Sequence, residues 1–185
     1  YGEDLTFTTE ARTYHENHEY VDLGLSVKWA TANIGENKPE KSGDYFAWGE
    51  TSPKSNYDWS TYLWCKHSDN MLESLTKYNT QSDLGAVDKL TTLNLSDDAA
   101  KQNWGGDWRM PTAKEMYELL TQCDWEATAT GYEVISRVNG KSIFLPAGGC
   151  MNKTSIFKPG EYGYYWSSGL VENDAKNAHV LYFNA

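Results

Sequence analysis

Short apolar stretches predict β-strands at several places along this chain of 185 residues. Apolar and polar side chains alternate over residues 26–31, as they do in a half-buried strand. A short apolar run at 45–48 predicts a buried strand, and residues 162–166 and 178–183 predict two more. The polar stretch 167–177 between the last two is expected to be a loop.

The strongest turn signal is the dipeptide Asn139-Gly140, which separates two further apolar stretches at 131–138 and 141–145. Asn-Gly favours a two-residue hairpin turn because both turn positions need a positive φ. The pattern therefore predicts an antiparallel hairpin that turns at this pair.

A helix is predicted directly after Thr112. Thr112 and Glu115 have the spacing of a capping box, in which each side chain binds the other residue's backbone amide. The apolar residues that follow fall on one helical face: Met116, Leu119, Leu120 and Cys123.

A second, shorter helix is expected to start at Asp97-Asp98-Ala99-Ala100. Ser96 is positioned to cap its first turn, and Gly105-Gly106 is expected to end it. Residues 49–90 are weakly patterned and rich in polar side chains, and such long irregular segments are often functional. The order of strands, long loops, two helices and more strands indicates an α+β fold with a small twisted antiparallel sheet.

The charge of the chain argues against two classes of partner. Its 16 basic and 26 acidic residues give a net charge of −10, which disfavours nucleic acid and anionic membrane surfaces. We also find no apolar stretch long enough for this domain to insert into a membrane, and no signal peptide. The 8 Trp and 13 Tyr residues fit either a core built from rings or an exposed aromatic binding surface.

The candidate metal and thiol chemistry is sparse. Cys65, Cys123 and Cys150 allow one disulfide at most, and we expect all three to be small buried hydrophobes. His15 and His18 have the spacing of a metal-binding pair on a helix, but their segment lacks helical periodicity. We therefore predict no metal site and no cofactor, while a structural calcium ion held by loop carbonyls stays open.

A series of sequence blocks resembles the bacterial major paralogous domain (FISUMP) family. The blocks follow the family's order from about residue 18 onward: 18–25, 27–30, 43–50, 97–100, 103–112, 144–148, 163–168 and 181–183. This family is related to the C-type-lectin-like group, which includes the formylglycine-generating enzyme fold and the variable proteins of diversity-generating retroelements.

The resemblance implies a single C-type-lectin-like domain over residues 18–185, with residues 1–17 as a linker or an N-terminal strand. It also implies an extracellular or outer-envelope location, with a lipid anchor through a removed N-terminal segment as one form. The family usually continues past the block at 181–183 to a final strand. The chain is therefore expected to be truncated at that strand or to receive it from another segment.

The resemblance also places a candidate ligand site. In the retroelement-diversified relatives, ligand-contacting residues fall between the Trp-Ser-Ser block and the last core strand, here residues 169–179. One of two tyrosines just before this window is expected to face outward. The predicted ligand-binding residues are Tyr164, Tyr165, Glu172, Asn173, Asp174, Lys176, Asn177 and His179. Their polar mix is typical of adaptable binding loops, although an ordinary solvated loop has the same composition.

Three functions remain as hypotheses. The first is a secreted or cell-surface binding or adhesin module that recognises a protein or glycan without catalysis. The second is a structural spacer or capping domain of a multidomain surface lipoprotein or fimbria-like assembly. The third is a degenerate formylglycine-generating-type oxidase, which would need a reactive cysteine pair; Cys150 lies in the C-terminal half, but no cysteine follows it.

Overall fold

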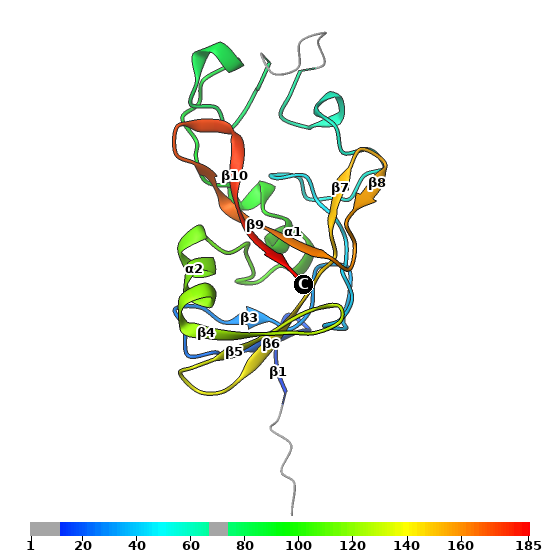
Figure 1. Ribbon diagram of the computed structural model, residues 1–185. Coiled ribbons are helices and arrows are strands. Elements are labelled where there is room, and N and C mark those ends of the chain that lie inside the picture. The colour runs from blue at the N-terminus through cyan, green and yellow to red at the C-terminus, as the bar shows by residue number, and fades with distance from the viewer. Residues whose placement is uncertain (1–11, 67–73) are drawn as a thin grey trace, which may run out of the picture.

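The structure, a computed structural model, describes residues 12–66 and 74–185 and is mixed α and β (Figure 1). Its helices are α1 (Ala99–Trp104) and α2 (Ala113–Gln122), with three short 3-10 turns, η1 (Trp59–Thr61), η3 (Ser82–Leu84) and η4 (Leu95–Asp97). Its strands are β1 (Thr13–His15), β2 (His18–Val21), β3 (Trp29–Ala30), β4 (Cys123–Ala127), β5 (Gly131–Ser136), β6 (Ser142–Pro146), β7 (Cys150–Asn152), β8 (Ser155–Phe157), β9 (Tyr162–Val171) and β10 (Asp174–Asn184).

The strands form several small antiparallel sheets rather than one large sheet. Two sheets have three strands, in the orders β1-β2-β3 and β4-β5-β6, and two are the hairpins β7–β8 and β9–β10. In Figure 1 the β4–β6 sheet lies below α2, and the long β9–β10 hairpin rises from the C-terminal end toward the upper loops. The mixed class expected from the sequence is therefore confirmed.

The main core lies where α2 meets the β4–β6 sheet and the inner face of β10. Met116 and Leu119 of α2 pack in one cluster with strand residues that include Val134 and Phe183. The helical periodicity predicted Met116 and Leu119 correctly as buried helix positions, whereas Cys123 is buried but lies past the helix as the first residue of β4. Leu120 was assigned wrongly to this face and is 50% exposed.

The capping box at the start of α2 is confirmed and is extended by an arginine. The Thr112 amide donates to Glu115 at 2.8 Å, and the Glu115 amide donates to the Thr112 hydroxyl at 3.2 Å. Arg109 donates to both Glu115 carboxylate oxygens, at 2.9 and 2.5 Å. These bonds, that from Arg109 first, hold the pKa of Glu115 below its ordinary value despite its burial.

Replacing Glu115 by Gln is expected to give a pH-dependent loss of stability. Because the folded-state pKa is lowered, the Glu115 carboxylate stabilises the fold above pH 4.5 and this contribution disappears as the pH falls below that value. At neutral pH the variant should unfold about 1 kcal/mol more easily, since Arg109 is partly exposed and solvent screens the pair. Urea titrations of Glu115→Gln from pH 7 to pH 3 test this, with the exposed Glu40→Gln as control. A difference from the wild type that stays constant over this range would contradict it.

Two strand predictions in the N-terminal half are wrong or only partly right. Within residues 26–31 only Trp29–Ala30 forms a strand, paired with β2. Residues 45–48 are irregular and do not pair with a neighbouring strand. Their side chains instead make individual hydrogen bonds to distant backbone groups. The Tyr45 hydroxyl donates to the Gly148 carbonyl at 2.6 Å, and the Trp48 indole donates to the Ser167 carbonyl at 2.8 Å.

The first helix starts two residues later than predicted. Asp98 is its N-cap and accepts from the Lys101 amide at 3.0 Å, while its other oxygen accepts from the Met110 amide at 2.8 Å. Ser96 is instead part of the η4 turn and donates to Asp97. The predicted end is confirmed, because Gly105 caps the helix with a φ of 74°.

The hairpin at Asn139-Gly140 is confirmed, but the two-residue turn is not. β5 already ends at Ser136 and β6 begins at Ser142, so the connection is longer. Of the dipeptide only Gly140 has a positive φ, 73°. Asn139 uses its side chain elsewhere, accepting from the Lys141 amide and donating to the Asp22 carbonyl. These bonds stabilise the wider turn.

The described part of residues 49–90 is irregular, as predicted, apart from the turns η1 and η3. Hydrogen bonds from a few side chains to the backbone hold it. The buried Tyr78 and its neighbour Asn79 both donate backbone amides to Asp88, at 2.8 and 3.0 Å. The segment then runs beside β9, where Leu93 donates its amide to the Ser168 carbonyl at 2.9 Å and Thr92 forms a bridge to Gly169. β9 is thus flanked by β10 on one edge and by this segment on the other.

Gly163 is expected to be the most sensitive glycine of the hairpin. A Cβ added there would overlap the Phe183 ring, whereas at Gly169 of the same strand the nearest atom is the Thr91 carbonyl oxygen at 3.8 Å. Gly163→Ala should lower the free energy of unfolding by roughly 1–3 kcal/mol, because the core cannot accept the extra atom without shifting. Urea denaturation should show a much smaller change for the matched control Gly169→Ala, and equal losses would contradict this packing argument.

Candidate binding site

The β9–β10 hairpin has an inner and an outer face because side chains alternate along each strand. The register pairs Trp166 with Val180 and Tyr164 with Tyr182 on the outer face. Between them, Tyr165 pairs with Leu181 on the inner face. The expectation that one of Tyr164 and Tyr165 faces outward is met by Tyr164.

The outer face carries a cluster of rings, here called the ring cluster: Tyr162, Tyr164, Trp166 and Tyr182. The Tyr182 ring stacks on Tyr162 with centroids 5.6 Å apart and planes at 18°, and lies 5.1 Å from Tyr164. Tyr182 is 50% exposed and Trp166 is 39% exposed, although the Trp166 indole donates to the Phe46 carbonyl at 3.1 Å. The cluster is therefore fixed in place while its rings still face solvent.

Tyr165 does not belong to this surface. Its hydroxyl donates to the Pro146 carbonyl at 2.9 Å and accepts from the Asn33 amide group at 3.3 Å. Its ring stacks on Phe183 in the core, and burial raises the pKa of its hydroxyl well above the ordinary value. This predicted site residue is half-buried: it packs against the core on the inner face of the hairpin and lines the inner part of the cleft described below.

The window predicted as a polar loop is the end of the hairpin instead. β9 extends to Val171 and β10 begins at Asp174, so only Glu172 and Asn173 form the turn. Asn173 adopts a φ of 58°, a left-handed conformation that Asn tolerates better than most residues. Sequence reasoning missed this because Ser167 and Ser168 look like loop residues but are buried strand residues here.

A β-bulge follows the turn and determines where the polar residues of this part of β10 lie. Val171 pairs with Asp174 but Leu170 pairs with Ala178, so residues 175–177 loop out of the ladder. Asp174 stabilises the bulge by accepting from the Lys176 amide at 3.0 Å and the Asn177 side chain at 2.7 Å. These bonds, that from Asn177 first, lower the pKa of Asp174.

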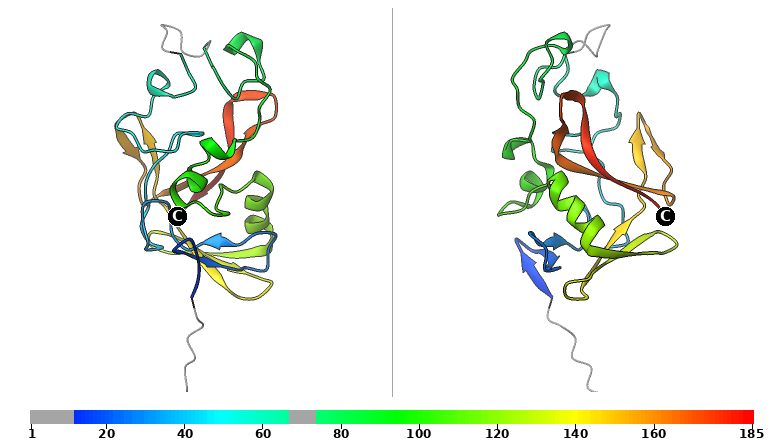
Figure 2. Two further views of the ribbon diagram at one scale, coloured as in Figure 1. Left: turned by 180° about the vertical axis from the view of Figure 1, so that it is seen from behind. Right: turned by 60° about the vertical axis from the view of Figure 1, so that its left-hand side comes forward.

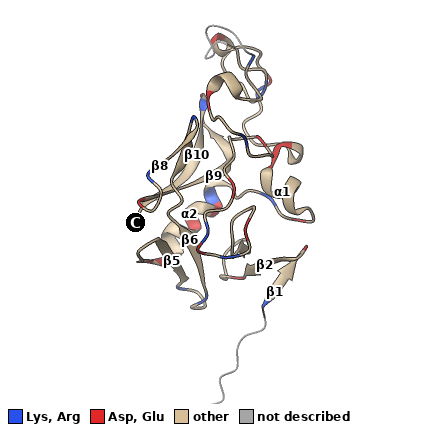
Figure 3. Cartoon of the chain, turned by 90° about the vertical axis from the view of Figure 1, so that its right-hand side faces the viewer, with Lys and Arg blue, Asp and Glu red and all other residues tan. Residues whose placement is uncertain are grey.

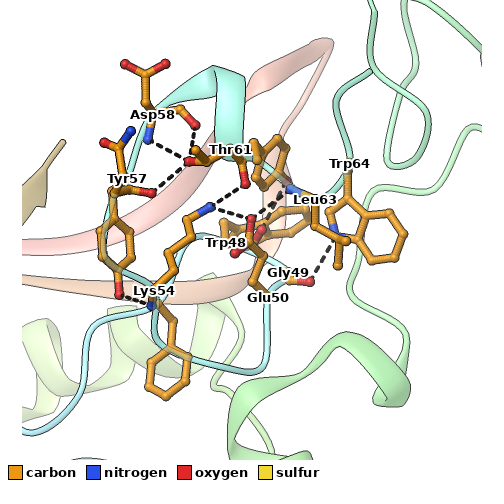
Figure 4. Close-up of polar contacts among 12 residues, drawn as sticks. Trp48, Gly49, Glu50, Lys54, Tyr57, Asp58, Thr61, Leu63 and Trp64 are labelled. Atoms are coloured by element: carbon orange, nitrogen blue, oxygen red, sulfur yellow. Dashed lines mark hydrogen bonds and ion pairs between the residues drawn. The ribbon is translucent and has the colours of Figure 1, made fainter. Parts of the chain in front are cut away.

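Two segments face the hairpin, and the first is held by a buried ion pair (Figure 4). Lys54 donates to the Glu50 carboxylate at 2.7 Å and to the Thr61 carbonyl at 3.0 Å. The same Glu50 oxygen accepts from the Leu63 amide at 2.9 Å. Both charged side chains are largely buried, at 18% and 10% exposure. This pair folds residues 50–63 into a compact loop around η1.

The second segment is the β7–β8 hairpin, which joins that loop directly. Tyr57 and Lys153 exchange two backbone hydrogen bonds, of 2.8 and 3.1 Å. At its other end β7 lies against β9, where Gly149 bridges Gly163. Figures 1 and 2 show the β7–β8 and β9–β10 hairpins standing side by side.

A cleft of about 1410 Å³ lies among these elements and extends past α1. Its part between β7, β10 and the η1 loop is here called the aromatic cleft, and it is lined by Tyr57, Trp59, Tyr62, Lys153, Tyr164, Trp166, Lys176, Asn177 and Val180. Of the predicted site residues, the structure brings Tyr164, Lys176 and Asn177 to this cleft. Glu172 and Asn173 lie at the exposed hairpin tip, Asp174 supports the bulge, and His179 is exposed on β10. The rings of the η1 loop were missed because no periodic pattern marks them.

The two histidines considered as a metal-binding pair make ring contacts and hydrogen bonds instead. His15 and His18 face each other across a two-residue turn at Glu16 and Asn17, both with positive φ. His18 stacks on Trp104 at 4.4 Å, and His15 accepts from the Asp107 amide at 3.0 Å. No group of three or more potential metal ligands is found within residues 12–66 and 74–185.

Cys65, Cys123 and Cys150 are thiols that are not joined in a disulfide. Cys65 and Cys123 are buried, and Cys150 on β7 is half-buried. Burial raises the pKa of the Cys123 thiol and that of Cys150. Both groups therefore hold their protons more tightly than an exposed thiol does.

Comparison with known proteins gave no relative. No family model, no curated protein and no solved structure matches the chain. Among the residues that the structure describes, no helix combines the length and the apolar character needed to cross a membrane. The assignment of function therefore depends on the residues themselves.

Lys54→Met is expected to destabilise the domain through the η1 loop. The substitution leaves the Glu50 carboxylate buried without its cation, at a cost of roughly 3 kcal/mol. Replacing both residues, as Lys54→Met with Glu50→Gln, should recover most of this loss because no unpaired charge remains. A double-mutant cycle by urea denaturation measures the coupling. Strictly additive losses would show that the pair is not coupled.

Proposed function

We propose that this chain is a C-type-lectin-like binding module, secreted or displayed on a bacterial cell surface, that recognises a protein or glycan ligand without catalysis. Its ligand contacts the outer face of the β9–β10 hairpin, in the aromatic cleft. The resemblance of the sequence blocks supports the fold and the location. The arrangement of side chains in the cleft supports the binding role.

The exposed ring cluster is the observation that carries this proposal. Aromatic side chains normally bury large areas, and an ordered row of them facing solvent marks a binding surface. Tyr182 and Trp166 are held by neighbouring rings and by the Phe46 carbonyl, so little freedom is lost when a ligand packs on them. The surface is thus prepared for a ligand in advance.

The chemistry of the aromatic cleft favours binding over reaction. Its lining consists mainly of rings, amides and lysines, and its carboxylate Asp58 is used as the N-cap of η1. Cys150 is the nearest thiol, and burial raises its pKa, which disfavours the thiolate that an oxidase needs. These features support the non-catalytic hypothesis over the oxidase.

Removal of single rings tests the site. Trp166→Ala and Tyr164→Ala are each expected to weaken ligand binding about tenfold or more, because both rings line the cleft and Trp and Tyr are enriched among interface residues whose truncation costs about 2 kcal/mol or more. Glycan arrays and capture from a surface-protein extract identify the ligand, and titration of that ligand measures the loss. Tyr117→Ala is the matched control, since Tyr117 on α2 is 63% exposed but lies outside the cleft.

Other outcomes redirect the assignment. A ligand that still binds both cleft variants but is lost from Tyr117→Ala would move the site to α2. No ligand for the wild type in either screen would contradict the binding function and favour the structural spacer.

A further inference from the structure

Acidic residues are sparse in the part of the chain that forms β6 to β10, while basic residues are as frequent there as elsewhere. Residues 141–185 contain four lysines and three acidic residues, whereas residues 1–140 contain 12 basic and 23 acidic residues. Figure 3 shows Lys and Arg on the ribbon around β8 and β10, while Asp and Glu mark many of the loops near α1. The β7–β8 and β9–β10 walls of the aromatic cleft therefore belong to a less acidic part of an acidic protein.

Two lysines at the cleft are available to a ligand. Lys153 and Lys176 both line it and both are exposed. Within residues 12–66 and 74–185, neither ammonium group takes part in a hydrogen bond or an ion pair. Lys54 differs, because its charge is neutralised by Glu50.

The nearby carboxylates are already engaged. The Asp58 carboxylate accepts from the Ser60 amide and hydroxyl at the start of η1, and these bonds first, then the charge of Lys153, lower its pKa. Asp174 is likewise near Lys176, and its oxygens are held by the bulge. An external anion can therefore approach both lysines without first displacing a protein ion pair.

The backbone fixes where Lys153 projects. Lys153 has a φ of 56° at the turn between β7 and β8, and its amide and carbonyl are both bonded to Tyr57. Lys176 is fixed in a similar way, because its amide is bound to Asp174 in the bulge. The two lysines therefore project from separate walls of the cleft, Lys153 from the β7–β8 hairpin and Lys176 from the bulge of β10. The outer face of the β9–β10 hairpin lies between them.

Resting on the proposed function, we propose that the ligand is an acidic glycan whose sugar rings pack on the ring cluster while its carboxylates pair with Lys153 and Lys176. Sugars offer C–H faces that suit aromatic rings, and hydroxyls that suit amides such as Asn152 and Asn177. The whole cleft, of which the aromatic cleft is one part, has a volume of about 1410 Å³ and exceeds a typical small-molecule pocket, which fits an extended chain that continues beyond the ring cluster. Charge complementarity selects the acidic form.

Polygalacturonate is a suitable probe, with its fully methyl-esterified form as the neutral counterpart and polyglutamate as an acidic peptide. Affinity electrophoresis and calorimetry should show binding of polygalacturonate that weakens with salt, and little binding of the ester. Lys153→Gln combined with Lys176→Gln should reduce the affinity about tenfold, as expected for two exposed charge pairs. Lys114→Gln, on the exposed face of α2, is the matched control and should bind like the wild type.

Three results would overturn the inference. Equal binding of the ester and the acid, with no effect of the lysine substitutions, would show that charge does not select the ligand. Equal binding of polyglutamate would show that the sugar is not recognised. Wild-type protein that binds none of the acidic polymers would also refute it. The proposed function is tested separately. If the ring substitutions abolish binding of a neutral glycan or a protein, the binding function stays supported even though the acidic-glycan inference fails.

Discussion

The alternation of side chains along β9 is the constraint on which the rest of the molecule depends. One face of this strand closes the core through Gly163 and Tyr165, and the opposite face presents Tyr164 and Trp166 to solvent. The Ser167 carbonyl accepts the Trp48 indole, and the Ser168 carbonyl accepts from Leu93. A single strand therefore connects the core, the irregular loops and the candidate binding surface.

The irregular half of the molecule is ordered mainly by side chains that bind backbone groups. Tyr57, Tyr62 and Trp64 donate to the carbonyls of Tyr45, Trp48 and Gly49. Each of these bonds satisfies a backbone acceptor that no helix or sheet would satisfy. The high Tyr and Trp content thus has two structural uses, because rings order the loops and also form an exposed cluster, which is the proposed binding surface.

The sequence predicted best those features that depend on local spacing. The capping box at Thr112 and Glu115, the apolar positions around Leu119 and the end of α1 at Gly105 all follow from contacts within a few residues. Features that depend on distant partners were not predictable in this way. The strand over Ser167 and Ser168 exists because segments about 75 and 120 residues earlier pair with it or bind its carbonyl groups.

The candidate site likewise combines features that local spacing predicts with features that depend on distant partners. The resemblance pointed to the hairpin that carries the exposed rings, and alternation indicated that only one of Tyr164 and Tyr165 faces out. The contribution of Tyr57, Trp59 and Lys153 could not be predicted, since a bridge between segments nearly a hundred residues apart brings them to the cleft. The tip residues Glu172 and Asn173 were selected for their polarity, yet they lie beyond the cleft because the strands continue.

The bulge at residues 175–177 separates the hairpin into two mechanically distinct parts. Below it, the ring cluster keeps its register through β9, β10 and the core. The bulge itself is anchored to the irregular loops, where the Ala175 amide donates to the Gln81 side chain at 3.1 Å, and above it lies the tip at Glu172 and Asn173. Residues inserted or removed within the bulge change the reach of the tip without shifting the strand pairs below. The hairpin can therefore diversify in length at one end while its other end remains a fixed part of the fold.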